Sequence, residues 1–237
     1  MVITGDAYFG SSNTNYGDIY GDVYCAGTLT NGLYGDIQGQ LYQNVSSAPI
    51  NPPGILPADF SLVYYIGSDV YSVGQLVPGD YYTALTLSPN GSNPAGVYYC
   101  NGNITFLNTV NINGTLIVKD DLSIKGNGDV IIQAVKNFPA LIIGGKLHID
   151  AATVKLTTTG YTQVGDHIDM HNRLNSSITV NGALYILDDG IKNTLTAYLT
   201  VTGMPQKTGL AMWSSGGNLT RWSPAAGAFY KTIARNP

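Results

Sequence analysis

Short segments in which apolar and polar residues alternate, each preceded by a turn, recur through the middle of the chain. The clearest copies are Asn101 to Phe106, Asp120 to Ile124 and Gly144 to Ile149. Alternation with a period of two predicts β-strands with one buried face. From Ile104 to Leu122 is 18 residues and from Leu122 to Leu147 is 25, a spacing typical of the coils of a parallel β-helix, so these strands are expected to stack.

The first 45 residues carry a second repeat with the same period. The segment Tyr16 to Ile19 returns as Tyr34 to Ile37, displaced by 18 residues, and both copies contain Gly-Asp. Glycine tolerates a corner and an Asp side chain bonds backbone there, so the pairs indicate turns. A calcium interpretation would use Asp6, Asp18, Asp22 and Asp36. Because the glycine-rich nonapeptide of calcium-binding β-rolls is missing, the turn interpretation is favoured.

Between these two sets of coils the pattern breaks. Residues 46 to 59 contain four prolines, which remove backbone donors, and predict a crossing loop. Pro57 to Ile66 places apolar residues on one face of a short helix that begins with proline. Residues 46–95 as a whole are therefore interpreted as loop, short helix and irregular segment, after the N-terminal coils at 1–45.

Regular coils are expected at 96–202, interrupted by an irregular excursion at 159–177. The tail, 203–237, concentrates bulky aromatic residues and is expected to form an aromatic cap that shields the last coil. The predicted fold is thus all-β: a right-handed parallel β-helix, or solenoid, with one short helix and an aromatic C-terminal cap, as a single domain over 1–237. The right hand is preferred because left-handed helices carry a strict six-residue repeat of small aliphatic residues.

Composition narrows the possible partners. Charged residues make up 11% of the chain, the formal net charge is −4 and no basic run occurs, which argues against nucleic acid and anionic membrane surfaces. No segment approaches the roughly 20 apolar residues that cross a bilayer, and a strand-like pattern begins at Val2, so an anchor or signal is expected to lie outside this sequence. Cys25 and Cys100 are either reduced core residues or one disulfide.

Three segments resemble a known family. The proline-rich loop that ends at Ser61, the segment Val97 to Ile104 and the segment Asn137 to Gly145 resemble the β-helical ectodomains of bacterial PilX-like pilus-associated surface proteins. The Gly-Asp-Val-Tyr coils show a looser likeness to polymer-forming bactofilins. The resemblance implies a surface or pilus-tip role without known catalysis, and the uncharged polar composition is common on extracellular proteins. A flat stack of coils rich in Tyr, Asn and Thr suits an extended polymer such as surface polysaccharide, or other pilus or surface subunits, as partners.

The densest group of titratable residues lies between Asp166 and His171. On a strand, His167, Asp169 and His171 would share one face, which suggests a metal site. Residues four apart on a strand stand about 13 Å apart, however, whereas zinc ligands converge to about 2 Å from the ion. The residues are therefore interpreted as a solvated loop, in which replacing His167 and His171 with Ala should leave stability nearly unchanged.

An enzyme is the alternative function. β-Helical polysaccharide lyases and hydrolases need acidic residues on one face, and Asp120, Asp121 and Asp150, joined by the Asp188-Asp189 pair, are the candidates. The adjacent Asp pairs open turns, where Asp is expected without catalysis. The sequence therefore favours a non-enzymatic structural or adhesive module, without a cofactor or metal. Its first coil, Val2 to Tyr8, is expected to leave an open edge for a neighbouring chain or an anchor.

Overall fold

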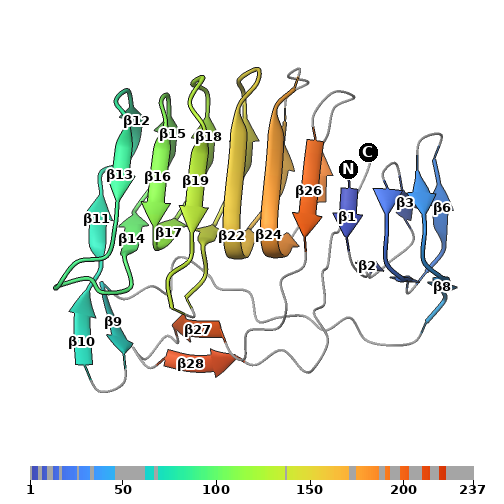
Figure 1. Ribbon diagram of the computed structural model, residues 1–237, viewed down its shortest axis with the longest axis horizontal. Helices are drawn as coiled ribbons and strands as arrows, with labels where there is room; N and C mark the ends of the chain where they lie inside the picture. The colour runs from blue at the N-terminus through green and yellow to red at the C-terminus, as the bar shows by residue number, and fades with distance from the viewer. Residues whose placement is uncertain are drawn as a thin grey trace.

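Most described strands are short and pair in parallel with a strand of the next coil (Figure 1). The computed structural model describes residues 2–4, 7–9, 13–15, 18–25, 27–32, 35–45, 62–66, 69–136, 138–170, 175–186, 190–192, 198–202, 210–213 and 219–222. Within these ranges the chain is all-β and contains no helix. The predicted parallel β-solenoid is confirmed, while its hand stays a prediction.

Three faces run along the stack. Face A contains β11 (Gly74–Leu76), β14 (Val97–Cys100), β17 (Thr115–Val118), β20 (Leu141–Ile143) and the second halves of β22 (Lys155–Val164) and β24 (Ser177–Ile186). Face B contains β12 (Gly79–Tyr81), β15 (Ile104–Phe106), β18 (Leu122–Ile124), β21 (Leu147–Ile149), β23 (His167–Asp169) and β25 (Gly190–Lys192). Face C contains β13 (Leu85–Leu87), β16 (Val110–Asn113), β19 (Val130–Gln133), the first halves of β22 and β24, β26 (Tyr198–Thr202), β1 (Val2–Thr4), β4 (Asp18–Ile19) and β7 (Asp36–Ile37).

The remaining strands complete the N-terminal coils or form hairpins. In the N-terminal coils, β2 (Ala7–Phe9), β5 (Val23–Cys25) and β8 (Leu41–Gln43) form one parallel sheet, and β3 (Asn13–Asn15) pairs with β6 (Leu29–Asn31). Two antiparallel hairpins join β9 (Val63–Ile66) to β10 (Asp69–Ser72) and β27 (Leu210–Trp213) to β28 (Leu219–Trp222).

Stacked apolar side chains fill the interior of the coils. On face B, Ile104, Leu122 and Leu147 occupy the same register position in successive strands and are at most 1% exposed. This column was predicted from the 18- and 25-residue spacings. Cys25 and Cys100 are buried and are not joined in a disulfide, which decides between the two alternatives left by the sequence. Burial, followed by the charge of Asp120, raises the pKa of the Cys100 thiol to about 11.

The order of coils in space differs from their order in sequence. The N-terminal coils lie beyond β26, since β1 pairs in parallel with β26 on one side and with β4 on the other. Figure 1 shows the blue strands continuing the row after the orange β26. One prediction was therefore wrong: within the predicted first coil, Val2 to Thr4 does not leave an open edge. Strand β26 is covered by the N-terminal coils, and the aromatic side chains expected to form a cap lie outside what the structure describes. Of the tail, the structure describes the backbone of β27 and β28.

A second apolar cluster lies on the outer side of face A, where the short helix was expected. Val63–Ile66 is strand β9 rather than helix, so that part of the prediction was wrong, and residues 57–61 lie outside the described ranges. Tyr64 of β9 packs edge-on against Phe138, with ring centroids 5.5 Å apart, in a cluster that includes the outward-facing Ile117 and Ile142. The helical pattern was misleading because this strand buries the Tyr64 side chain against a second core.

Residues 67–95 are also more regular than predicted. They contain β10 and a complete coil made by β11, β12 and β13, which pair with β14, β15 and β16. The regular stack therefore begins at Gly74 instead of residue 96. Turn residues such as Gly79 and Asp80 suggested irregularity, yet they lie within the edge strand β12.

Candidate functional site on face B

The outer side of face B carries one polar position per strand in a continuous row. Strand pairing aligns Asp80 with Thr105, Thr105 with Ser123, Ser123 with His148, and His148 with Asp169. The apolar neighbours of each residue in its strand point into the core, so this alternation sends the polar side chains outward. We call this row, Asp80, Thr105, Ser123, His148 and Asp169, the polar column. Adjacent members are separated by the spacing of parallel strands, about 4.8 Å.

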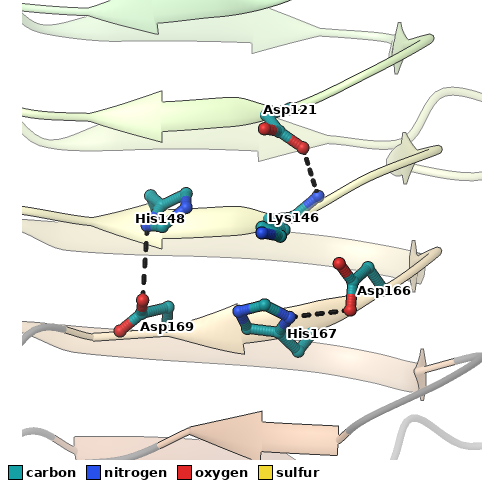
Figure 2. A network of polar contacts seen from close by, with 6 residues as sticks. All are labelled: Asp121, Lys146, His148, Asp166, His167 and Asp169. Carbon is teal, nitrogen blue, oxygen red and sulfur yellow. Dashed lines mark hydrogen bonds and ion pairs between the residues drawn. The ribbon is translucent and has the colours of Figure 1, made fainter.

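At β21 and β23 the column broadens into a His–Asp cluster, defined as Asp121, Lys146, His148, Asp166, His167 and Asp169 (Figure 2). His148 Nδ1 lies 3.5 Å from Asp169 Oδ2 in the next strand. His167 Nδ1 lies 2.7 Å from Asp166 Oδ1, and the two imidazole rings have centroids 6.4 Å apart in an edge-on arrangement. The cluster thus places two imidazole–carboxylate pairs side by side on one outer surface.

Exposure differs between the two pairs. The side chains of His148 and Asp169 are 25% and 16% exposed, and that of Asp166 is 31% exposed, whereas that of His167 is only 5% exposed. A molecule in solution can therefore reach His148, Asp169 and Asp166. The buried His167 side chain contacts the Asp166 carboxylate and is itself almost inaccessible to a molecule in solution.

The predicted irregular excursion at 159–177 is largely strand. Residues 155–164 form β22, residues 167–169 form β23, and β24 begins at Ser177. His167 is buried and hydrogen-bonded, so the expectation of an exposed loop residue was wrong. The sequence obscured this because Thr157 to Gly160 lacks large apolar residues. The inward position at Thr158 is filled by a threonine, whose hydroxyl accepts a hydrogen bond from the Thr162 hydroxyl at 2.8 Å.

The three residues of the metal hypothesis are not all placed by the structure. His167 and Asp169 both occupy outward positions of β23, as predicted for a strand, but they contact different partners, Asp166 and His148. His171 lies outside the described residues. Within the described part of the chain, no group of three or more His, Cys, Asp or Glu side chains is arranged to hold a metal ion.

The acidic residues of the enzyme alternative are separated. Asp121 immediately precedes β18, whereas Asp150 immediately follows β21, so the two lie at opposite ends of paired strands. Four positions along a strand amount to about 13 Å, beyond the roughly 5 to 10 Å between the carboxyl groups of hydrolases. Asp120 precedes Asp121 at the same corner. The Asp188-Asp189 pair lies outside the described residues.

Asp121 has a structural partner at its corner. Its Oδ1 accepts a hydrogen bond from the backbone N–H of Lys146 at 2.8 Å, and its own N–H donates to Asn103 Oδ1 at 2.9 Å. The same device recurs in the N-terminal coils, where Gln40 N–H donates to Asp22 Oδ1 at 2.9 Å. The turn interpretation is confirmed at Asp22 and Asp121, with the addition that each side chain bonds the next coil.

Sequence reasoning missed His148. The repeat spacing does predict that His148 lies beside Ser123. It aligns Leu122 with Leu147, so the residues that follow them, Ser123 and His148, occupy neighbouring positions. The contact with Asp169 was not predictable in the same way, since it requires the 21-residue step from His148 to Asp169, and that step falls in the segment interpreted as a loop.

The geometry defines the class of the molecule as a parallel β-solenoid that carries a His–Asp cluster on one flat face. The chain matches no protein-family model, and comparisons with curated proteins and with solved structures give no significant match. No helix long and apolar enough to span a membrane occurs among the residues that the structure describes.

Proposed function

We propose that the protein is a non-enzymatic structural or adhesive module of a bacterial cell-surface or pilus-associated protein, and that face B binds an extended polymer such as a surface polysaccharide. The observation that carries the proposal is the polar column. It offers a hydroxyl, imidazole or carboxylate group in every coil from β12 to β23. An extended chain lying along the stack would meet these groups at a repeat of about 4.8 Å.

The affinity of such a surface for a polymer comes from several hydrogen bonds formed at once. A single exposed hydrogen bond contributes little net affinity, about 0.5–1.5 kcal/mol, but a polymer that contacts several coils gains several such bonds. In β15, β18, β21 and β23 the inward side chains beneath the column are at most 1% exposed, so the binding groups are held in place before the ligand arrives. Preorganisation of this kind lowers the entropy lost on binding.

The location and the pilus partner rest on the sequence resemblance. The polar, weakly charged composition, with charged residues at 11%, is common on extracellular proteins and supports the same placement. Other pilus or surface subunits are the second class of partner.

A polysaccharide lyase or hydrolase is the alternative, and one observation favours it. The His148 imidazole stands beside the Asp169 carboxylate on a partly exposed surface, an arrangement that can orient a general base. If the protein is an enzyme, this pair is a better candidate than Asp120, Asp121 or Asp150. Asp150 lies at the opposite end of the paired strands from the corner that holds Asp120 and Asp121.

Co-sedimentation with insoluble chitin and binding to soluble pectin, a neutral and an acidic polymer, test the proposal. We expect a Ser123→Ala/His148→Ala variant to bind at least about tenfold more weakly than wild type, since it loses two adjacent groups of the column. Asn111→Ala is the matched control, because Asn111 is an exposed outward residue of β16 on face C. Equal loss in the control, or no binding of either polymer by wild type, would contradict the polysaccharide proposal.

The same incubations separate binding from cleavage. We expect neither unsaturated products nor new reducing ends, with or without calcium. Products that disappear in Asp169→Ala or in an Asp120→Ala, Asp121→Ala or Asp150→Ala variant would replace the non-enzymatic proposal with the enzyme.

A further inference from the structure

The junction between β26 and β1 joins two parts of the chain that are distant in sequence. Val2, Ile3 and Thr4 pair with Thr200, Val201 and Thr202, and β1 then pairs with β4. We call this junction the seam. The N-terminal coils, residues 2–45, are therefore attached to the stack at the seam by strand pairing, whereas the chain itself leaves them at Val45 and is next described at Leu62, beside the opposite end.

The seam is narrower than the joints within the stack. The coil of β17, β18 and β19 pairs with the following coil on all three faces. Among the described strands, pairing across the seam occurs on face C alone: face B ends at β25, while β2 and β3 pair with β5 and β6. The seam covers three residue pairs, compared with ten that join the coil of β17, β18 and β19 to the following coil. Within the described ranges, fewer strand-to-strand residue pairs therefore hold the N-terminal coils in place than join coils inside the stack.

Chain length permits these coils to dock in more than one place. From β13 to β7 there are eight inter-strand steps along face C, roughly 38 Å at about 4.8 Å a step. The connection from Val45 to Leu62 has about 17 residue steps, which reach at most roughly 56–61 Å. The maximum reach of this connection is therefore longer than the distance from one end of the stack to the other. The additional length allows the N-terminal coils to reach a second molecule that lies alongside.

We propose that the N-terminal coils exchange between two copies of this chain, so that β1 of each copy docks on β26 of the other. Exchange recreates every contact of the seam between molecules, so the only loss is the entropy of association, which concentration offsets. The partner is a second copy rather than an unrelated protein, because the edge of β26 is already complementary to β1 of this sequence. This inference is independent of what face B binds.

Single cysteine variants test the exchange. Thr4 and Thr202 are register partners, and paired strands about 4.8 Å apart lie within the Cα separation that a disulfide allows, about 4.4–6.8 Å. Thr4→Cys and Thr202→Cys proteins are mixed at high concentration in urea below the main unfolding transition, returned to buffer and oxidised. We expect a disulfide-linked heterodimer from the mixture and from neither variant alone; the native thiols are buried, and wild type gives the background.

The matched control uses Thr86 and Asn111, register partners in β13 and β16, whose coils are joined directly by the chain. The mixture of Thr86→Cys and Asn111→Cys should give no heterodimer. A double Thr4→Cys/Thr202→Cys variant, oxidised at low concentration, should close within one chain and remain monomeric in light scattering. The proposal is overturned if that double variant closes while the Thr4→Cys and Thr202→Cys mixture yields no heterodimer. It is equally overturned if the double variant cannot close at all, because the seam pairing would then be absent.

Discussion

At the scale of single residues, Asn93 is the centre of a buried polar network and is 4% exposed. Its Oδ1 accepts hydrogen bonds from the Tyr64 hydroxyl and from the Val97 N–H, both at 2.8 Å, and its Nδ2 donates to the Val97 carbonyl at 2.8 Å. The Tyr64 hydroxyl also accepts from Ala95 N–H at 3.0 Å. Burial, the largest effect, raises the pKa of Tyr64, so this hydroxyl stays a donor.

Replacing Asn93 with Ala should lower the free energy of unfolding by about 1–3 kcal/mol, because the buried Tyr64 hydroxyl and the Val97 amide lose their partner. Asn101→Ala is the control, since Asn101 accepts a single exposed hydrogen bond from the Tyr99 hydroxyl, and should change stability by less than about 0.5 kcal/mol. Urea denaturation measures both. Equal effects would mean that the Asn93 network is not what holds the β9–β10 hairpin to the solenoid.

At the scale of elements, the coils are joined by corners as much as by strands. Gly114 links β16 of face C to β17 of face A with φ at 149°, and a Cβ built there would lie 2.0 Å from the carbonyl oxygen of Gly96 in the preceding coil. Gly160 and Gly182 occupy the equivalent corner within β22 and β24, in register with each other. Backbone of one coil therefore approaches backbone of the next where a side chain cannot fit.

Gly114→Ala should destabilise the protein by more than about 3 kcal/mol, because positive φ and a backbone clash act together and neither neighbour can rotate away. Gly91→Ala tests the contribution of glycine as such: a Cβ there meets nothing within 4 Å, so its effect should stay within about 1 kcal/mol. Thermal and urea unfolding compare the two. Similar free energies of unfolding for the two variants would show that the coils can move apart at this corner without destabilising the protein.

At the scale of the whole molecule, stability is expected to be uneven along the stack. The coils between β14 and β24 have partners on both sides, whereas β6, β7 and β8 each pair with one strand, and Leu41 of β8 is 38% exposed. The N-terminal coils combine this exposed end with the narrow seam. In a solenoid, stability is close to a sum of nearest-neighbour terms, so weakly joined terminal coils open first.

Native-state hydrogen exchange should therefore show amides of β4, β5 and β7 exchanging at least about tenfold faster than those of β17, β18 and β19, equivalent to a local opening about 1.4 kcal/mol easier. The closed Thr4→Cys/Thr202→Cys disulfide should reduce that difference. Uniform protection along the stack would contradict a weak seam.

The strands, their register and several corners follow from the amino-acid pattern alone. Alternation at Ile104, Leu122 and Leu147 set both the strands and their register, because the period of two assigns each side chain to a face and a one-residue slip would expose the whole core. The corner roles of Asp22 and Asp121 also followed from residue type. The strands, their register and the corner roles depend only on neighbouring residues or on the next coil. The spacing of the repeats is therefore enough to predict them.

The order of the coils in space depends on tertiary contacts, because β1 pairs with β26 rather than stacking in chain order. A parallel strand edge accepts any strand of matching pattern, so nothing in the alternation of residues 2–45 distinguishes docking on β26 from stacking in chain order. The same cause hid the contact between His148 and Asp169, which depends on the true length of one coil. It also hid β9, whose Tyr64 side chain packs in a second core on the outside of face A, a surface that no local pattern reveals.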